Sequence, residues 1–430
     1  MTTIVTAANA AEFLSLVPRL LGYRPTRSLV LIPFAAKRTL GAMRVDLPPD
    51  GDDADCTAAT LIGMVCKVAA ADAVAVVSYT DETFGAGRGI PHAQLARALE
   101  SRADACGLRI VDALCVAADA WGSYLEGDSA GEGRPLAELG IDPPGLESLA
   151  LPEGDQSTGA ELPDADPAAQ ELVARALRSV ASAVTMLCGE EAGRAAPPAS
   201  GETGAAKADA AGTRDAAAPG VAAAPGVAAE PGAAVRGAAP QAVGQQAGDE
   251  PEESGRVDPR ALAAVCALDD LPHLFEAALG WDAETVDPFD AAVLAWCLSR
   301  PALRDIALIE WCSGLAAGDT ALDAQLRWER GEEYPAHVAM RMWGEGERPD
   351  PERLATALEL VRHVAALAPR GHRAGPLAVS GWLAWALGRS THAGRYADLA
   401  CELEPEHGLA EIVRSFVHAG HLPEWAFERR

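Results

Sequence analysis

The stretch that decides the fold is residues 18–34, which read PRLLGYRPTRSLVLIPF. It describes the end of a helix, a tight connection and a short apolar strand. Gly22 is a suitable helix stop, because glycine adopts the left-handed backbone at low cost. The apolar run at 28–34 then favours a strand. The chain is therefore expected to enter a sheet directly after its first helix.

A helix precedes this connection. Asn9 and Glu12 match a helix cap and its partner three residues later. Pro18 lies inside the pattern, so we expect the helix to kink or restart there. The apolar residues on one face recur at helical spacing and are Phe13, Leu16, Val17, Leu20 and Leu21.

The rest of the first half alternates strands and helices. Residues 39–47 alternate in polarity and follow the first strand closely, which predicts an antiparallel hairpin. Strands separated by helices are typical of right-handed crossovers and parallel pairing. We therefore expect an α/β half in which helices flank a mixed, mostly parallel sheet of about four strands. The predicted elements are a helix at 53–70, a strand at 73–79, a helix at 91–106, a strand at 108–117 and a closing helix at 167–187.

The middle of the chain changes composition. Residues 191–255 are mainly Ala, Gly and Pro, and Pro-Gly recurs every six positions within 217–234. Such a segment cannot bury a core, so a disordered tether is the default, with recognition by a partner as the alternative. The sequence thus divides into an α/β domain at 1–190, a disordered Ala/Pro/Gly-rich linker at 191–256 and an all-helical domain at 257–430.

The second half has helical patterns throughout. Gly381, Ala393, Ala400 and Pro405 lie where a tetratricopeptide-like helix pair places its small residues and its terminal proline. The large residues of that pattern are displaced, and one weak repeat predicts a helical hairpin, not a repeat array. The predicted helices are 288–298, 301–315, 320–330, 335–343, 351–367, 376–387, 391–403 and 407–418.

The formal net charge of the 430 residues is −27 at pH 7. Nucleic acids and anionic membranes both attract basic segments, so we expect neither as a partner. The alternative is that the acidic side chains only keep the surface solvated and say nothing about partners. No secretory signal is visible, and the longest apolar run, 61–79, is broken by Lys67 and Asp72. The nine cysteines form no Cys-x-x-Cys pair, which favours small buried hydrophobes in a reducing compartment and a cytoplasmic protein.

Three short runs carry candidate ligand-binding residues. Arg24, Arg27 and Ser28 crowd the opening connection, where guanidinium groups suit a carboxylate or phosphate. Gly87 lies in the run GAGRG between a strand and a helix, where α/β sheets bind anions. Ser123 and Tyr124 belong to the run WGSY after the last strand. The structural alternatives are neutralisation of neighbouring acids, a plain loop and a capped sheet edge.

No metal, cofactor or catalytic residue is predicted. His418 and His421 form a His-x-x-His pair without a nearby third ligand, and His363 and His372 are separated by a turn. The Gly-rich run has the spacing of neither a dinucleotide fingerprint nor a P-loop. No nucleophile elbow or paired-carboxylate motif stands out.

Three motifs carry a resemblance to a known family. LLGYRP with SLVL in the opening stretch resembles the actinobacterial domain-of-unknown-function family numbered 4192, and WGSY is similar to its Trp-x-Ser-Tyr element. Residues 373–388 are similar to its closing helical segment. Relatives often carry cysteines after the Trp-x-Ser-Tyr element, whereas residues 125–134 have none, which argues against a metal or redox role there. The resemblance spans nearly the whole chain except the linker and implies no reaction, cofactor or partner.

Two functions are therefore weighed. The first is a non-enzymatic module whose α/β half binds a small ligand or partner and whose helical half binds a protein partner. The alternative is an enzyme that acts on a small anionic metabolite at the strand carboxyl ends. They differ in whether the opening connection, the Gly-rich loop and the WGSY run converge on one cleft. We favour the module, because no catalytic constellation is visible.

Overall fold

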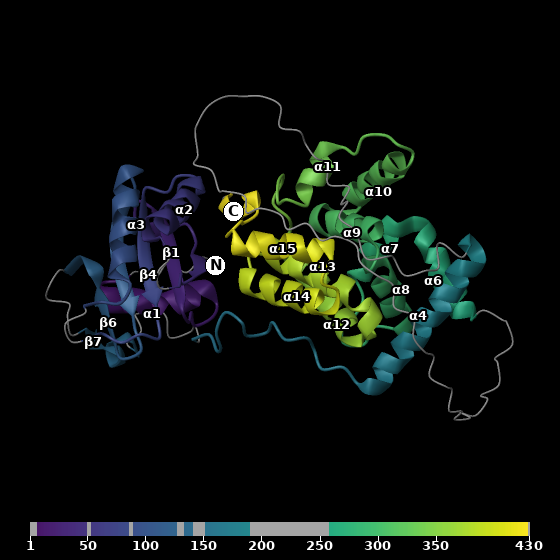
Figure 1. The fold of residues 1–430 in the computed structure, drawn as a ribbon, viewed down its shortest axis with the longest axis horizontal. Coiled ribbons are helices and arrows are strands. Elements are labelled where there is room, and N and C mark those ends of the chain that lie inside the picture. Colours follow the sequence, from purple (N-terminus) through teal and green to yellow (C-terminus); the bar gives the residue numbers. More distant parts are fainter. Residues whose placement is uncertain are drawn as a thin grey trace, which may run out of the picture.

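The computed structural model describes residues 7–49, 53–85, 89–126, 133–140, 151–189 and 258–428. These residues form two halves that lie side by side, a sheet flanked by helices and a body of packed helices (Figure 1). A mixed-sheet half and a helical half are thus both present, as predicted. The predicted linker at 191–256 lies outside the described residues.

The described strands of the first half form one sheet in the order β2-β1-β4-β5-β6-β7, and β3 also pairs with β1. Within this sheet β4 and β5 pair in parallel, and every other described pair is antiparallel. The strands are β1 (Ser28–Ala35), β2 (Arg38–Thr39), β3 (Met43–Asp46), β4 (Ala73–Tyr79), β5 (Arg109–Val116), β6 (Ala120–Ser123) and β7 (Arg134–Pro135).

The prediction of a mostly parallel sheet is therefore wrong: the sheet is mostly antiparallel. The expected hairpin of β1 with β2 and β3 is confirmed, and so is the parallel crossover from β4 to β5. However, β1 lies between β3 and β4 and runs antiparallel to both. The helix that joins β3 to β4 consequently connects strands that are not neighbours.

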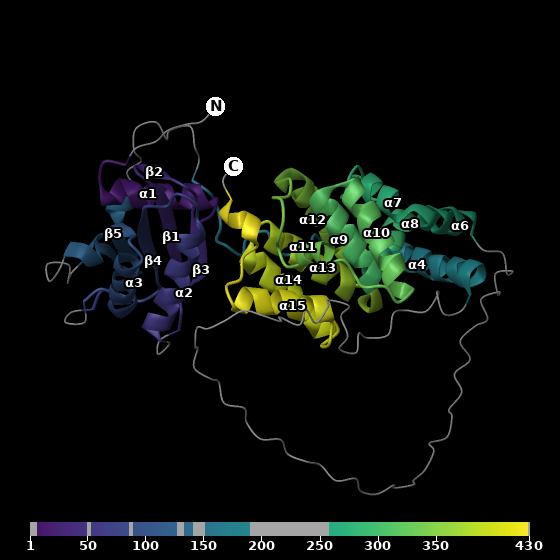
Figure 2. The same cartoon turned by 90° about the horizontal axis from the view of Figure 1, so that it is seen from above.

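Helices cover both faces of the sheet (Figure 2). α1 (Ala10–Leu21) packs on the face that carries Val30 and Ile32, whereas α2 (Ala54–Lys67) and α3 (Ala93–Ala105) pack on the face that carries Leu29 and Leu31. Val30 and Ile32 alternate with Leu29 and Leu31 along β1, because successive strand residues point to opposite faces of the sheet.

The ends of α1 follow the sequence prediction. Asn9 Oδ1 accepts a hydrogen bond from Glu12 N at 2.9 Å, and Gly22 ends the helix in the left-handed conformation with φ of 81°. α1 continues through Pro18 as one helix, so the helix does not restart there, and a kink stays a prediction. Proline removes only one helical hydrogen bond of its own, and the apolar face of α1 on the sheet outweighs that loss.

The second half is helical, and no strand occurs within described residues 258–428. α4 was expected to close the α/β half, but its apolar face, which includes Val173, Leu177 and Val180, belongs to the helical core. α6 and α7 were not predicted. The helices are α4 (Pro167–Cys188), α6 (Pro259–Cys266), α7 (Leu271–Ala278), α8 (Pro288–Leu298), α9 (Pro301–Ser313), α10 (Leu315–Glu329), α11 (Ala336–Arg341), α12 (Pro351–Leu367), α13 (Ala374–Ala386), α14 (Ser390–Leu403) and α15 (Gly408–His418).

Tryptophans anchor the helical core. Trp382 and Trp385 of α13 are fully buried, and their indole N–H groups donate to the carbonyl oxygens of Met342 and His421, respectively. α13 and α14 approach closely at Gly381, where a Cβ would lie 3.3 Å from the carbonyl oxygen of Ala393. The predicted helix pair is therefore packed as a hairpin, and its likeness to a tetratricopeptide unit stays a prediction.

Candidate functional site

The opening connection lies at the carboxyl end of β4, because Ser28 pairs with Tyr79 in the sheet. Arg27 adopts a left-handed backbone with φ of 41°, and its exposed Nε lies 3.7 Å from Asp81 Oδ2. Ser28 is buried, and its hydroxyl donates to the carbonyl oxygen of Thr26 at 2.6 Å. Arg24 is exposed. Of these predicted residues, only Arg27 and Arg24 present side chains to solvent.

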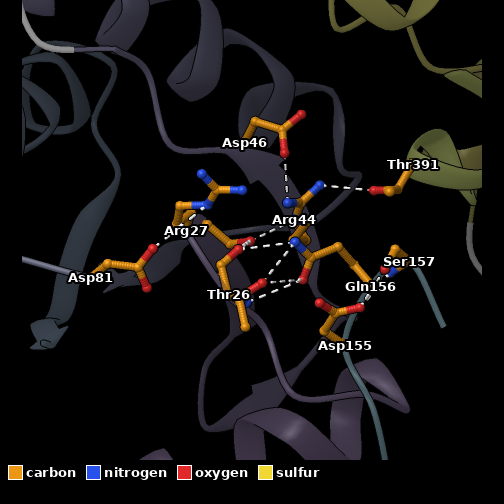
Figure 3. Close-up of polar contacts among 10 residues, drawn as sticks. Thr26, Arg27, Arg44, Asp46, Asp81, Asp155, Gln156, Ser157 and Thr391 are labelled. Atoms are coloured by element: carbon orange, nitrogen blue, oxygen red, sulfur yellow. Dashed lines mark hydrogen bonds and ion pairs between the residues drawn. The ribbon is translucent and has the colours of Figure 1, made fainter. Parts of the chain in front are cut away.

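Arg44 links this connection to the helical half. Its side chain is 7% exposed; Nε donates to the Ser28 hydroxyl at 2.7 Å and Nη1 to the Thr391 hydroxyl of α14 at 3.0 Å (Figure 3). Asp46 pairs with Nη2 at 2.6 Å, so the buried charge is compensated. The Ser28 hydroxyl is therefore used for holding the two halves together, a structural role that the sequence analysis did not foresee.

Arg44→Met is expected to destabilise the chain by about 1–3 kcal/mol, because Ser28 and Thr391 each lose a charge-assisted hydrogen bond. Urea unfolding followed by circular dichroism measures the change. Arg38→Met on the exposed edge strand β2 is the control and is expected to change stability by less than about 0.5 kcal/mol. Equal stabilities for the two variants would contradict the assigned role of Arg44.

The two predicted residues of the WGSY run, Ser123 and Tyr124, lie on different faces of the sheet. Ser123 pairs with Leu114 on the α1 face of the sheet and is buried, with its hydroxyl 3.4 Å from Asp112 Oδ1. Tyr124 packs with Cys115, the neighbour of Leu114 on the opposite face, and donates to the carbonyl oxygen of Pro91 at 2.7 Å. Gly87 lies outside the described residues. Ser123 and Tyr124 therefore face away from each other and serve packing contacts.

The sequence analysis missed a polar group at the carboxyl ends of β4 and β5. His92 Nε2 lies 3.1 Å from the Thr80 hydroxyl and 3.4 Å from Glu82 Oε1. The backbone of His92 is left-handed, with φ of 57°, immediately before α3. The only signal in the sequence was a histidine next to Pro91, at the expected start of a helix. The side chains of Thr80, Glu82 and His92 thus serve as polar partners for one another.

The helical half contains an open groove of about 750 Å³. It lies between α9, α10 and α11 and the loop at 342–350 that leads into α12. This volume is typical of small-molecule binding sites. The sequence analysis predicted a binding surface in this half but not its position.

Arg341 lines this groove and is only 9% exposed. Its Nη1 donates to the carbonyl oxygen of Glu345 at 3.1 Å, its Nε is buried without a hydrogen-bond partner, and its Cζ lies 5.0 Å from the ring centre of Trp425. No described carboxylate forms an ion pair with Arg341. By contrast, the equally buried Arg304 lies 2.9 Å from the Asp305 carboxylate. The groove wall therefore carries a buried positive charge without a negative partner.

The start of α10 opens onto the same groove. Gly314 precedes the helix with φ of 89° and offers no capping side chain, whereas Asp350 caps α12 through its carboxylate. Gly314 and Ala317 both line the groove. Free N–H groups at a helix start carry partial positive charge and favour an anion. The groove thus combines a buried guanidinium with an uncapped helix terminus.

A buried carboxyl group adjoins the groove. Glu310 of α9 is fully buried, and neither carboxyl oxygen accepts a hydrogen bond from a described donor. Burial, reinforced by the nearby Glu276, raises the pKa of Glu310 to about 8. Arg353 donates to both oxygens of Glu276 and lowers the pKa of that carboxyl. Protonated Glu310 is then a hydrogen-bond donor toward charged Glu276.

Other classes of site were also examined in the described residues. No cluster of three His, Cys, Asp or Glu side chains there is placed to hold a metal ion. No described helix has the length and apolar character needed to cross a membrane. All nine cysteines are free: Cys115, Cys297 and Cys312 are buried, Cys401 is half-buried, and the others are exposed. The prediction that most cysteines are buried is therefore wrong.

The fold and the groove define a two-part protein, with a sheet-based half linked to a helical half that carries the groove. The chain belongs to a family described as a domain of unknown function (DUF4192), whose model matches residues 11–424. This match confirms the resemblance carried by the opening stretch and extends over both halves. No curated protein and no solved structure matches the chain.

Proposed function

We propose that this chain is a non-enzymatic, cytoplasmic binding module that takes an anionic ligand in the groove of its helical half. The observation that carries the proposal is Arg341, which is buried at the groove wall without a carboxylate partner. The uncapped start of α10 at the same groove supports it independently.

The energetics favour an anion at this position. A buried charge costs several kcal/mol unless an opposite charge compensates it. The cation–π contact with Trp425 offsets only part of this cost. Exposed Glu347 on the groove lining is screened by solvent and compensates Arg341 little. A bound carboxylate or phosphate supplies the missing charge, so ligand binding is expected to stabilise the fold.

The enzyme alternative has less support. It placed its site at the strand carboxyl ends and built it from Arg24, Arg27, Ser28, Gly87, Ser123 and Tyr124, of which Gly87 lies outside the described residues. Among the described residues, Ser28 is engaged by Arg44, and Ser123 and Tyr124 lie on opposite faces of the sheet. We therefore assign the α/β half a supporting role.

Arg341→Met is expected to weaken the binding of an anionic probe by about tenfold or more, since it removes a charge-assisted contact in a desolvated position. A thermal-shift screen of the full chain with inorganic phosphate, organic acids and nucleotides identifies the probe, and calorimetry measures its affinity. Arg348→Met is the control, because Arg348 lines the same groove but is exposed.

Arg348→Met is expected to bind the probe within about twofold of the unmodified chain. The proposed function fails if no probe of any class stabilises the protein. It also fails if Arg341→Met binds the probe as well as Arg348→Met does.

A further inference from the structure

The groove walls are apolar around the buried charge. Ile309, Val338 and Met340 line it together with Ala317 and Ala336. A carboxylate group alone fills a small part of about 750 Å³ and leaves the accessible parts of Met340, Ala317 and Ala336 in contact with water. A ligand that also brings an apolar portion removes that surface from water, which is the dominant favourable contribution in pockets of this kind.

The charges in the groove favour a ligand with one negative charge. Arg341 is the one buried cation of the described lining that lacks a carboxylate partner, since Arg353 is paired with Glu276. Glu345 and Glu347 also line the groove. A second negative charge on the ligand meets only the exposed Arg348, whose charge is screened by solvent, and it is repelled by half-buried Glu345.

The available donors suit a carboxylate. A guanidinium group matches the two oxygens of a carboxylate, and the start of α10 at Gly314 adds the positive end of a helix dipole. A phosphate group is usually held by several cations, whereas of the three arginines in the described lining Arg353 is paired with Glu276 and Arg348 is exposed.

On the basis of the proposed function, we propose that the ligand of this groove is an amphiphilic monocarboxylate. Its carboxylate binds Arg341 at the groove wall, and its apolar tail lies against Ile309, Val338 and Met340.

A chain-length series tests this proposal on the full, unmodified protein. Acetate, butyrate, hexanoate and octanoate are compared by calorimetry with 1-octanol, succinate and inorganic phosphate. The affinity is expected to rise with tail length, by up to about fourfold for each CH₂ group that is buried. Octanol, which has the tail without the charge, is expected to bind at least about tenfold more weakly than octanoate. Val338→Thr changes the side-chain volume little but places a hydroxyl on the groove wall. It is expected to lower the affinity for octanoate several-fold and to leave the affinity for acetate unchanged.

The outcomes separate this inference from the proposed function. If phosphate or succinate binds more tightly than octanoate and the binding depends on Arg341, the inference is overturned and the proposed function stands. If affinity does not change with tail length, or octanol matches octanoate, the inference is likewise overturned. If none of these compounds binds, and the wider screen is also silent, both fail.

Discussion

Gly375→Ala is expected to destabilise the helical half by about 3 kcal/mol or more. Gly375 lies in the first turn of α13, where that helix crosses the end of α8. A Cβ at this position would lie 2.4 Å from the carbonyl oxygen of Leu298 and 2.8 Å from the Cα of Ser299. Both neighbours are backbone atoms, so the helices must separate to admit one methyl group.

Urea unfolding followed by the tryptophan fluorescence of the helical half measures this loss. Gly371→Ala is the matched control, because Gly371 lies just before α13 and a Cβ there meets nothing within 4 Å. Its free energy of unfolding is expected to stay within about 0.5 kcal/mol of the unmodified chain. A Gly375→Ala protein that unfolds at the same urea concentration as Gly371→Ala would show that α8 and α13 do not approach this closely.

Individual helices and strands could be predicted from the sequence, because each depends on a pattern of neighbouring residues. The strand predicted at 73–79 and the helix predicted at 351–367 match β4 and α12 at both ends. The placement of β1 between β3 and β4 is not a local property. It depends on which strand edges meet when the sheet assembles, and a continuous apolar run such as β1 suits parallel and antiparallel pairing alike. α4 was assigned to the α/β half for the same reason: the apolar face of a helix does not specify which neighbour it packs against.

The groove escaped the sequence analysis for a related reason. Arg341 lies in the helix predicted at 335–343, and the sequence pattern gives it no partner. In the structure α11 ends at Arg341, and the guanidinium donates to the backbone carbonyl of Glu345. The groups around this guanidinium, Trp425 among them, come from distant parts of the chain. A local pattern therefore does not show that Arg341 is buried without a carboxylate partner.

Glu310→Gln is expected to stabilise the protein increasingly as the pH rises from about 4.5 to about 8, and the gain is expected to level off above that. In the folded chain the Glu310 carboxyl has its pKa raised to about 8, whereas the ordinary pKa is 4.5. Between these values the folded state binds the extra proton, so the free energy of unfolding falls as pH increases. The stabilisation that protonated Glu310 gives the folded chain is complete below about pH 4.5 and is lost as the pH passes through about 8.

The groups around Glu310 explain why ionisation is unfavourable there. Glu276 of α7 and Asp319 of α10 both oppose a negative charge, and only Arg353 of α12, already bonded to Glu276, favours it. Gly318 packs closely against this carboxyl, since a Cβ there would lie 2.5 Å from Glu310 Oε2. Glutamine has nearly the same shape, carries no charge and still donates a hydrogen bond toward Glu276. Because one pKa unit corresponds to about 1.4 kcal/mol, the difference at pH 8–9 is on the order of a few kcal/mol.

Urea titrations at pH 5, 7 and 9 compare Glu310→Gln with Glu332→Gln, a control at an exposed glutamate beyond the end of α10. Subtracting the control removes the titration of every other group that the two proteins share. A difference that widens from pH 5 to pH 9 is the expected result. A difference that is flat across this range, or that shrinks with rising pH, would mean that Glu310 is charged in the folded protein. The carboxyl next to the groove would then add a negative charge beside Arg353, and the anion proposed at Arg341 would meet a less favourable field from α9.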